Sequence, residues 1–177
     1  MDLTSDTVCK QISMIYFSYG SNMSMPRLHA RLPSALRLDT GILMRHRLRF
    51  HKVSTRDGSA KCDIEETGDN NHRVYGVLFE ITEREKADLD RFEGLGTGYA
   101  QKKVGVELPD GARVQAVTYY ATLIDPTLRP FDWYKEHVLR GARANALPEG
   151  YIQSIEAIPS IPDADLERYI NELSIYR

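Results

Sequence analysis

Apolar residues first gather in a short, aromatic-rich run over residues 14–19, which ends at Gly20. A run of this kind followed at once by glycine predicts a buried strand that meets a tight turn. A helix is predicted next, because Asn22 or Ser24 can cap its start and two leucines then lie four residues apart on one face. Pro33 is expected to end it.

The middle of the chain carries β-branched and aromatic residues in short stretches. These predict strands over residues 42–52, 60–66, 73–81, 99–108 and 113–121. Turn signals at residues 68–71 and 109–111 separate some of them. We expect the strands to follow one another as a β-meander.

Helical signals lie between two of these strands and at the end of the chain. Thr82 predicts a helix start, because Glu85 three residues later completes a capping box. Leu89 and Phe92 form the apolar stripe of this helix, which is expected to end at Gly94. Further helices are predicted over residues 133–146, 151–158 and 163–174. Strands in one run with helices at both ends predict an α+β fold whose largely antiparallel sheet can curl into a barrel.

The composition predicts one ordinary globular domain. The chain has 177 residues, of which 42% are hydrophobic and 27% charged. We assign the domain to residues 14–177 and read residues 1–13 as a loose N-terminal extension. A formal net charge of -2 disfavours nucleic acid and anionic membrane surfaces as partners, so we expect a small-molecule ligand.

Cysteine usage and hydropathy bear on the compartment. Cys9 and Cys62 have neither a paired zinc-site spacing nor the density of a disulfide scaffold. Residues 1–13 lack the continuous apolar run that a secretory signal contains. No apolar run anywhere in the sequence approaches the length of a membrane-spanning helix. We expect a soluble, cytoplasmic protein. The oligomeric state stays open, with a homodimer among the alternatives.

The segment Gly20-Ser21-Asn22 is a candidate binding loop. Between a strand and a helix, successive backbone N–H groups and the positive end of the helix dipole would converge on one small volume, which suits an oxyanion. The alternative is structural: Gly20 makes a turn and Asn22 caps the helix.

Glu93 is a candidate proton carrier. It lies four positions after Leu89 and therefore on the inward-facing side of its helix, where a carboxylate is costly. The alternative is that the side chain reaches solvent at the helix end. The following loop, residues 94–98, contains three glycines and leaves room for a ligand or a moving lid.

Three other features are assigned structural roles. The basic run over residues 45–52 is read as a solvated strand face, because alternation sends Leu48 and Phe50 to one side and the charges to the other. The five histidines show no zinc-ligand spacing. Cys62 alternates with apolar neighbours and is read as a small core residue.

Several segments, in order along the chain, resemble the gamma-glutamylcyclotransferase family. The segment Tyr19-Gly20-Ser21-Asn22 is similar to the family's opening signature, and residues 74–79 and 90–94 are similar to its central strand and catalytic-glutamate helix. Residues 140–151 resemble its C-terminal Gly-Ala, Leu-Pro and Tyr pattern. The likeness runs from about residue 14 to residue 159. It differs from the glutathione-specific branch, whose signature has Leu where this chain has Asn22.

The resemblance implies a mixed, largely antiparallel β-barrel with peripheral helices and a reaction that needs no cofactor or metal. In that reaction the α-amine of a gamma-glutamyl group attacks its own γ-carbonyl, which releases 5-oxoproline and an amino acid or amine. Glu93 matches the family's catalytic glutamate. The substrate-binding residues implied are Tyr19, Gly20, Ser21, Asn22, Tyr99 and Tyr119, with Tyr120 as the alternative to Tyr119.

Two rival functions remain. One is a binding protein without catalysis that senses a gamma-glutamyl or related metabolite in the same pocket. The other is removal of a gamma-glutamyl tag from a biosynthetic intermediate. A carboxylate on an apolar face favours catalysis, because a binding protein has no need of one there.

Overall fold

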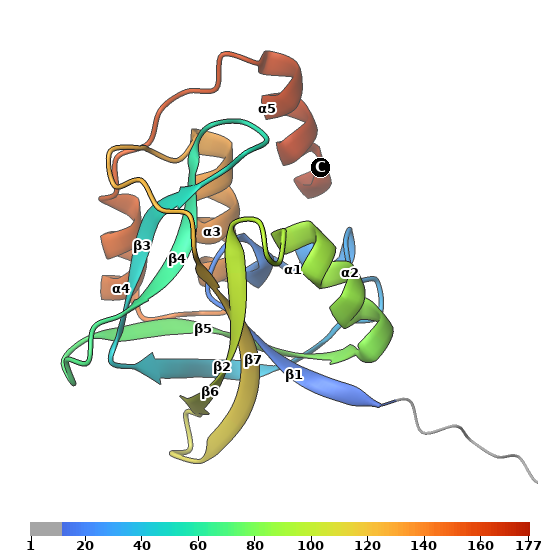
Figure 1. The fold of residues 1–177 in the computed structure, drawn as a ribbon, viewed down its shortest axis with the longest axis vertical. Helices are drawn as coiled ribbons and strands as arrows, with labels where there is room; N and C mark the ends of the chain where they lie inside the picture. The colour runs from blue at the N-terminus through green and yellow to red at the C-terminus, as the bar shows by residue number, and fades with distance from the viewer. Residues whose placement is uncertain (1–11) are drawn as a thin grey trace, which may run out of the picture.

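The computed structural model describes residues 12–177 and places a closed five-stranded barrel at the centre of the fold (Figure 1). In barrel order its strands are β1 (Ser13–Ser18), β5 (Arg73–Thr82), β2 (Leu36–Met44), β6 (Tyr99–Glu107) and β7 (Arg113–Ala121). Only the pairing of β1 with β7 is parallel, at Tyr16 and Val117. The expected α+β class with a mixed, largely antiparallel barrel is therefore confirmed. Residues 1–11, which include Cys9 and most of the predicted extension, lie outside the described residues.

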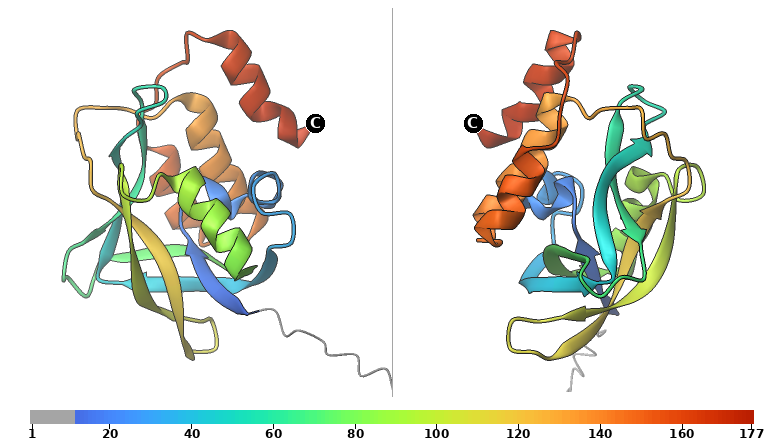
Figure 2. Two further views of the ribbon diagram at one scale, coloured as in Figure 1. Left: turned by 45° about the vertical axis from the view of Figure 1, so that its right-hand side comes forward. Right: turned by 90° about the vertical axis from the view of Figure 1, so that its left-hand side faces the viewer.

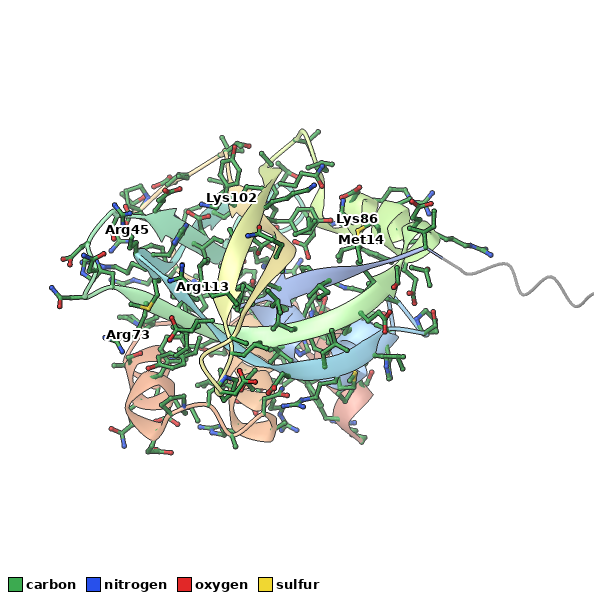
Figure 3. The ribbon with its side chains drawn as sticks, turned by 90° about the horizontal axis from the view of Figure 1, so that it is seen from below. Met14, Arg45, Arg73, Lys86, Lys102 and Arg113 are labelled. Carbon is green, nitrogen blue, oxygen red and sulfur yellow. The ribbon has the colours of Figure 1, made fainter. Side chains whose placement is uncertain are left out.

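The predicted single strand over residues 42–52 is wrong. The chain forms two strands here, because Arg45 adopts a positive φ of 65° and its N–H donates to the carbonyl of His72 at 2.7 Å. Arg45 thus turns the chain beside Arg73, at the start of β5 (Figure 3). After the turn, β3 (His46–Val53) leaves the barrel and pairs with β4 (Ala60–Glu66) in a separate two-stranded sheet. The expected meander is also wrong, since β5 lies between β1 and β2.

Helices close the barrel and extend beyond it. They are η1 (Ser21–Met23), α1 (Met25–His29), α2 (Glu83–Glu93), α3 (Asp132–Ala144), α4 (Glu149–Glu156), α5 (Leu166–Leu173) and η2 (Ser174–Tyr176), where η marks a 3-10 turn. The capping box of Thr82 and Glu85 is present at the start of α2. The first helix is shorter than predicted and ends well before Pro33. No helix within residues 12–177 is long and apolar enough to cross a membrane.

The packing of α3 against the turn after β1 positions the site. In α3, Gly141 lies so close to this turn that an added Cβ would be 2.6 Å from both the Cβ of Met23 and the backbone nitrogen of Ser24. On the other side of the turn, α2 lies beside α1, whereas α5 stands farther from the barrel (Figure 2). The end of β1 is therefore enclosed by α2 and α3, which come from distant parts of the sequence.

Candidate active site

A small inner chamber, with a volume of about 30 Å³, lies at the end of β1. Its walls are Tyr16, Ser18, Tyr19, Gly20, Ser21, Asn22, Cys62, Glu93, Tyr99, Tyr119 and Tyr134. The seven residues assigned to the site from the sequence are all among them. The fold thus brings together side chains from β1, β4, β6, β7, α2 and α3.

The loop after β1 supplies unused backbone donors. Residues Ser21–Met23 form a 3-10 turn, in which the Met23 N–H donates to the Gly20 carbonyl at 3.0 Å. Within residues 12–177, the N–H groups of Gly20, Ser21 and Asn22 donate to no protein acceptor. The helix expected to open here begins only at Met25 and has five residues. An anion at this loop would therefore be bound by the backbone N–H groups of the loop and not by a helix dipole.

Ser18 contributes a second unused polar group. Its side chain is 1% exposed and lines the inner chamber, yet its Oγ has no hydrogen-bond partner within residues 12–177. Buried hydroxyls are nearly always paired, and an exception calls for an explanation. A ligand polar atom in the inner chamber would supply the missing partner.

Glu93 stands at the edge of the inner chamber as the last residue of α2. The helix ends there because Gly94 takes a left-handed conformation with φ 68°, and the Leu95 N–H closes the turn onto the Asp90 carbonyl at 2.9 Å. The side chain of Glu93 is 16% exposed. Its Oε1 accepts a hydrogen bond from Nδ2 of Asn22 at 2.8 Å. The carboxylate is thus directed toward the chamber rather than toward solvent.

Asn22 links Glu93 to two further side chains. Its Nδ2 also lies 3.2 Å from the hydroxyl of Tyr16, and its Oδ1 accepts from Nη1 of Arg31 at 3.0 Å. The same Nη1 lies 3.8 Å from Oε1 of Glu93. The binding loop, the helix α2 and the segment after α1 therefore meet in one hydrogen-bonded group.

The inward position predicted for Phe92 is wrong. Leu89 is fully buried, as expected, but Phe92 is 43% exposed. The helix is ending at this point, so Phe92 faces away from the barrel and lies beneath the guanidinium of Arg31, whose Cζ is 5.3 Å from the ring centroid. The apolar face of α2 is therefore narrower than the sequence suggests.

Tyrosines line the inner chamber with hydrogen-bonded side chains that carry no charge near neutral pH. The hydroxyl of Tyr19 donates to the Tyr119 carbonyl at 2.7 Å, and that of Tyr99 donates to the Cys62 carbonyl at 2.5 Å. The Cys62 N–H donates to the hydroxyl of Tyr134 at 3.0 Å. Burial raises the pKa of four of these hydroxyls well above the usual value: Tyr16, Tyr19, Tyr99 and Tyr134. They therefore act as hydrogen-bonding groups and not as acids near neutral pH.

Of the two adjacent tyrosines on β7, Tyr119 faces the inner chamber. It is 2% exposed, and its hydroxyl donates to Oδ1 of Asp90 at 2.6 Å. Tyr120 points to the opposite side of the strand, where Nζ of Lys102 lies 5.5 Å from its ring centroid. Neighbouring strand residues point to opposite faces, so the register selects Tyr119.

An outer cavity of about 300 Å³ adjoins the inner chamber. Both are lined by Ser21, Glu93, Tyr99 and Tyr134, so Glu93 stands where they meet. Lys52 also lines the outer cavity, which corrects the reading of residues 45–52 as a solvated face. The register of β3 shifts between Phe50 and Lys52, and a bulge of this kind re-aims a side chain.

Sequence reasoning missed several residues that line the inner chamber or contact Glu93. These are Tyr16, Ser18, Arg31 and Tyr134. For Tyr16 and Ser18 a signal existed, because residues two apart on a strand share a face. Arg31 lies in the turn after α1 and Tyr134 in α3, and neither residue carried a local signal.

Cys62 is buried in the core, as expected, and also lines the inner chamber. Burial raises the pKa of its thiol, so it is a poor source of thiolate. Within residues 12–177, no group of three or more His, Cys, Asp and Glu side chains could hold a metal ion.

Comparison with known proteins finds a family match, curated relatives and solved structures similar to this chain. The sequence matches the AIG2-like family over residues 73–155. It is 31% identical over 152 residues to the gamma-glutamylcyclotransferases of Bos taurus and of Homo sapiens, and each alignment covers 82% of this chain and 79% of the relative. A solved gamma-glutamyl cyclotransferase structure superposes with a TM-score of 0.79 at 26% identity, covering 91% of this chain and 99% of the other.

The sequence identity extends over most of both chains, and the solved structure shares the fold along nearly the whole described length. The chain therefore belongs to the gamma-glutamylcyclotransferase family.

Proposed function

We propose that this protein cyclises a gamma-glutamyl amino acid or amine, releasing 5-oxoproline and the free amino acid or amine. One observation carries the proposal for this chain: a carboxylate that is 16% exposed, Glu93, lies beside a loop whose three backbone donors have no acceptor among residues 12–177. A proton acceptor and a set of oxyanion donors are the two groups that an acyl transfer to an amine requires.

Glu93 would carry the protons. The α-amine of a gamma-glutamyl group is protonated near neutral pH and cannot attack until it loses a proton. Glu93 takes this proton, and the amine nitrogen then bonds to the γ-carbonyl carbon to close a five-membered ring. When the bond to the departing nitrogen breaks, the protonated Glu93 gives its proton to that nitrogen. The regenerated carboxylate then takes the second proton that the ring nitrogen loses, and this proton passes to the released amine or to solvent. The substrate supplies both reacting groups, the amine and the carbonyl. The reaction is therefore an internal acyl transfer, and it involves no net oxidation.

The binding loop would hold the substrate and stabilise charge. Negative charge develops on the γ-carbonyl oxygen as the amine attacks, and the N–H groups of Gly20, Ser21 and Asn22, which have no acceptor within residues 12–177, belong to residues that line the same chamber as Glu93. The Oγ of Ser18 is a further partner for a polar group of the glutamyl moiety. Holding the chain bent, with amine and carbonyl in contact, removes much of the entropic barrier to ring closure.

We assign one half of the substrate to each of the two cavities. A volume of about 30 Å³ admits about one water molecule, so the gamma-glutamyl group enters the inner chamber only when its walls move apart. The leaving group would occupy the larger outer cavity, on the other side of Glu93. In this arrangement the bond that breaks lies at the junction where Glu93 stands.

The proposal is tested by incubating the purified protein with a panel of gamma-glutamyl amino acids and amines and measuring 5-oxoproline. We expect release from at least one gamma-glutamyl amino acid. The panel includes glutathione, for which Asn22 in place of the leucine of the glutathione-specific branch predicts slower turnover than for dipeptides. Tight binding of panel compounds without any 5-oxoproline would instead support the rival function, a binding protein.

A further inference from the structure

The outer cavity concentrates positive charge in a chain whose net charge is -2. Its cationic lining residues are Arg27, Arg31, Lys52, Arg56, Lys61 and Arg91, and its carboxylates are Asp57, Glu93 and Glu172. A cavity lined mainly by one sign of charge raises the local concentration of ligands of the other sign. The half of the site that faces the leaving group is therefore suited to an anion.

Two of the six cations have no carboxylate partner among residues 12–177. The other four are paired: Arg27 with Glu172, Arg31 with Glu93, Lys61 with Asp57 and Arg91 with Asp88. Within the described part of the chain, neither Lys52 nor Arg56 forms a salt bridge or a side-chain hydrogen bond. These two side chains are thus available to a ligand.

Lys52 is partly buried at the inner end of the outer cavity. Its Nζ lies 4.6 Å from the ring centroid of Tyr99, which lines both cavities. The side chain packs against Gly98, where an added Cβ would come within 2.9 Å of Cε of Lys52. Burial lowers the pKa of this ammonium, whereas the charge of Glu93 opposes that shift. A partly desolvated cation without a partner is costly, and a ligand carboxylate would remove that cost.

Arg56 lies farther out, in the connection between β3 and β4. Arg56 is exposed and lines the same cavity as Lys52, which precedes it by four residues in the chain. The two free cations therefore mark an inner and an outer position along the path that a leaving group takes from Glu93 to solvent.

We propose that the outer cavity selects leaving groups with two carboxylates, so that the preferred substrates are gamma-glutamyl derivatives of acidic amino acids. Lys52 binds the α-carboxylate, which is the acid nearest to the departing nitrogen, and Arg56 binds the side-chain carboxylate. A simple amine lacks both groups and becomes a cation on release, which this lining repels. The inference rests on the proposed function and narrows its substrate class.

Two substrates of equal size test the inference: gamma-glutamyl-glutamate and gamma-glutamyl-glutamine, which differ by one charge. We expect kcat/KM to favour the glutamate compound by about five- to tenfold at low ionic strength, and this ratio to fall as salt screens the charges. Arg56→Gln should bring the ratio close to one. Lys52→Gln should lower kcat/KM for both compounds, because both carry the α-carboxylate. Lys103→Gln, which removes an exposed charge on β6 outside either cavity, should leave the ratio unchanged.

The outcomes separate the inference from the proposed function. Equal kcat/KM for the two compounds in the parent protein would overturn the inference and leave the function standing. Absence of 5-oxoproline from every compound would overturn both. A second measurement needs no variant: inhibition of the parent protein by free glutamate is compared with inhibition by free glutamine. We expect glutamate to inhibit at a lower concentration. Equal inhibition would count against the two-carboxylate site.

Discussion

The side-chain nitrogen of Asn22 lies 2.8 Å from Oε1 of Glu93, although the two residues are 71 positions apart in the sequence. The orientation of the amide is set by its other end, because Oδ1 of Asn22 accepts from Arg31. Asn22 therefore presents its NH₂ group to the carboxylate and joins the binding loop to the proposed proton carrier. A movement of one of these two elements would be transmitted to the other.

We expect Asn22→Ala to lower kcat by roughly 10- to 100-fold and to change KM less, because it frees the Glu93 side chain while leaving the backbone donors of the loop in place. The measurement is the rate of 5-oxoproline release at saturating substrate. Asn70→Ala, in an exposed turn, is the matched control and should have no effect. An unchanged kcat for Asn22→Ala would show that the hydrogen bond does not orient Glu93 for catalysis.

Ser18→Ala separates binding from stability. The unpaired buried hydroxyl of Ser18 costs free energy in the empty protein, so its removal should leave the melting temperature unchanged or raise it slightly. If a ligand polar atom pairs with this hydroxyl, kcat/KM should fall by about tenfold in the same variant. A variant that is less stable but equally active would contradict the assignment of Ser18 to the ligand.

Gly141→Ala tests the contact between α3 and the turn before α1. The added methyl would lie 2.6 Å from the backbone of Ser24, so either the helix or the turn must shift. We expect a loss of roughly 1–3 kcal/mol in the free energy of unfolding, together with a raised KM as the binding loop moves. Gly150→Ala is the control, because nothing lies within 4 Å of its added methyl. Similar melting temperatures for the two variants would show that the contact tolerates a side chain.

The parts of the site that follow from the sequence are those with local signals. The strand that ends at Gly20 and the capping box at Thr82 depend on neighbouring residues, and the spacing from Leu89 places Glu93 on the inward side of α2. The register of β7 could not be predicted between Tyr119 and Tyr120, because alternation fixes only that they face opposite ways.

The remaining features depend on contacts between distant segments. Arg45 takes a left-handed conformation that is typical of glycine. Because the residue is not glycine, the sequence did not predict the end of β2 or the departure of β3 from the barrel. Lys52 lines the outer cavity after a bulge in β3 that strand alternation does not anticipate. Tyr134 reaches the inner chamber from α3 only because that helix packs against the turn after β1.

Stability should depend on pH through His137, a fully buried residue of α3 that faces Arg27, Glu172 and Tyr176. Burial lowers its pKa to about 4, whereas an unfolded chain has a histidine pKa near 6.5. Between these values the unfolded state binds the proton and the folded state does not. The free energy of unfolding should therefore fall as the pH drops from 6.5 to 4, by up to about 1.4 kcal/mol per pH unit.

The contribution of His137 is isolated by comparing the parent with His137→Gln. Glu172 does not obscure the upper part of this window, from about pH 6.5 to 4.5. Burial would raise its pKa, but the hydrogen bond from His137 and the charge of Arg27 lower it to about 2, so the stability that Glu172 contributes is lost below about pH 4.5. We expect the variant to be less stable at pH 7 and to lose less stability between pH 6.5 and 4.5. Parallel pH profiles for the two proteins would mean that another group dominates.

Glu93→Gln is expected to lower turnover by roughly 10²- to 10⁴-fold while substrate affinity stays within about tenfold. Glutamine keeps the volume of the side chain and can still accept the hydrogen bond from Asn22 through its amide oxygen, but it cannot take a proton from the α-ammonium. Folding should survive, because the neighbouring Arg31 retains its hydrogen bond to Asn22. The informative comparison is therefore 5-oxoproline release by parent and variant with matched melting temperatures. Equal rates would show that Glu93 is not the proton carrier and that another group, or solvent, removes the proton before ring closure.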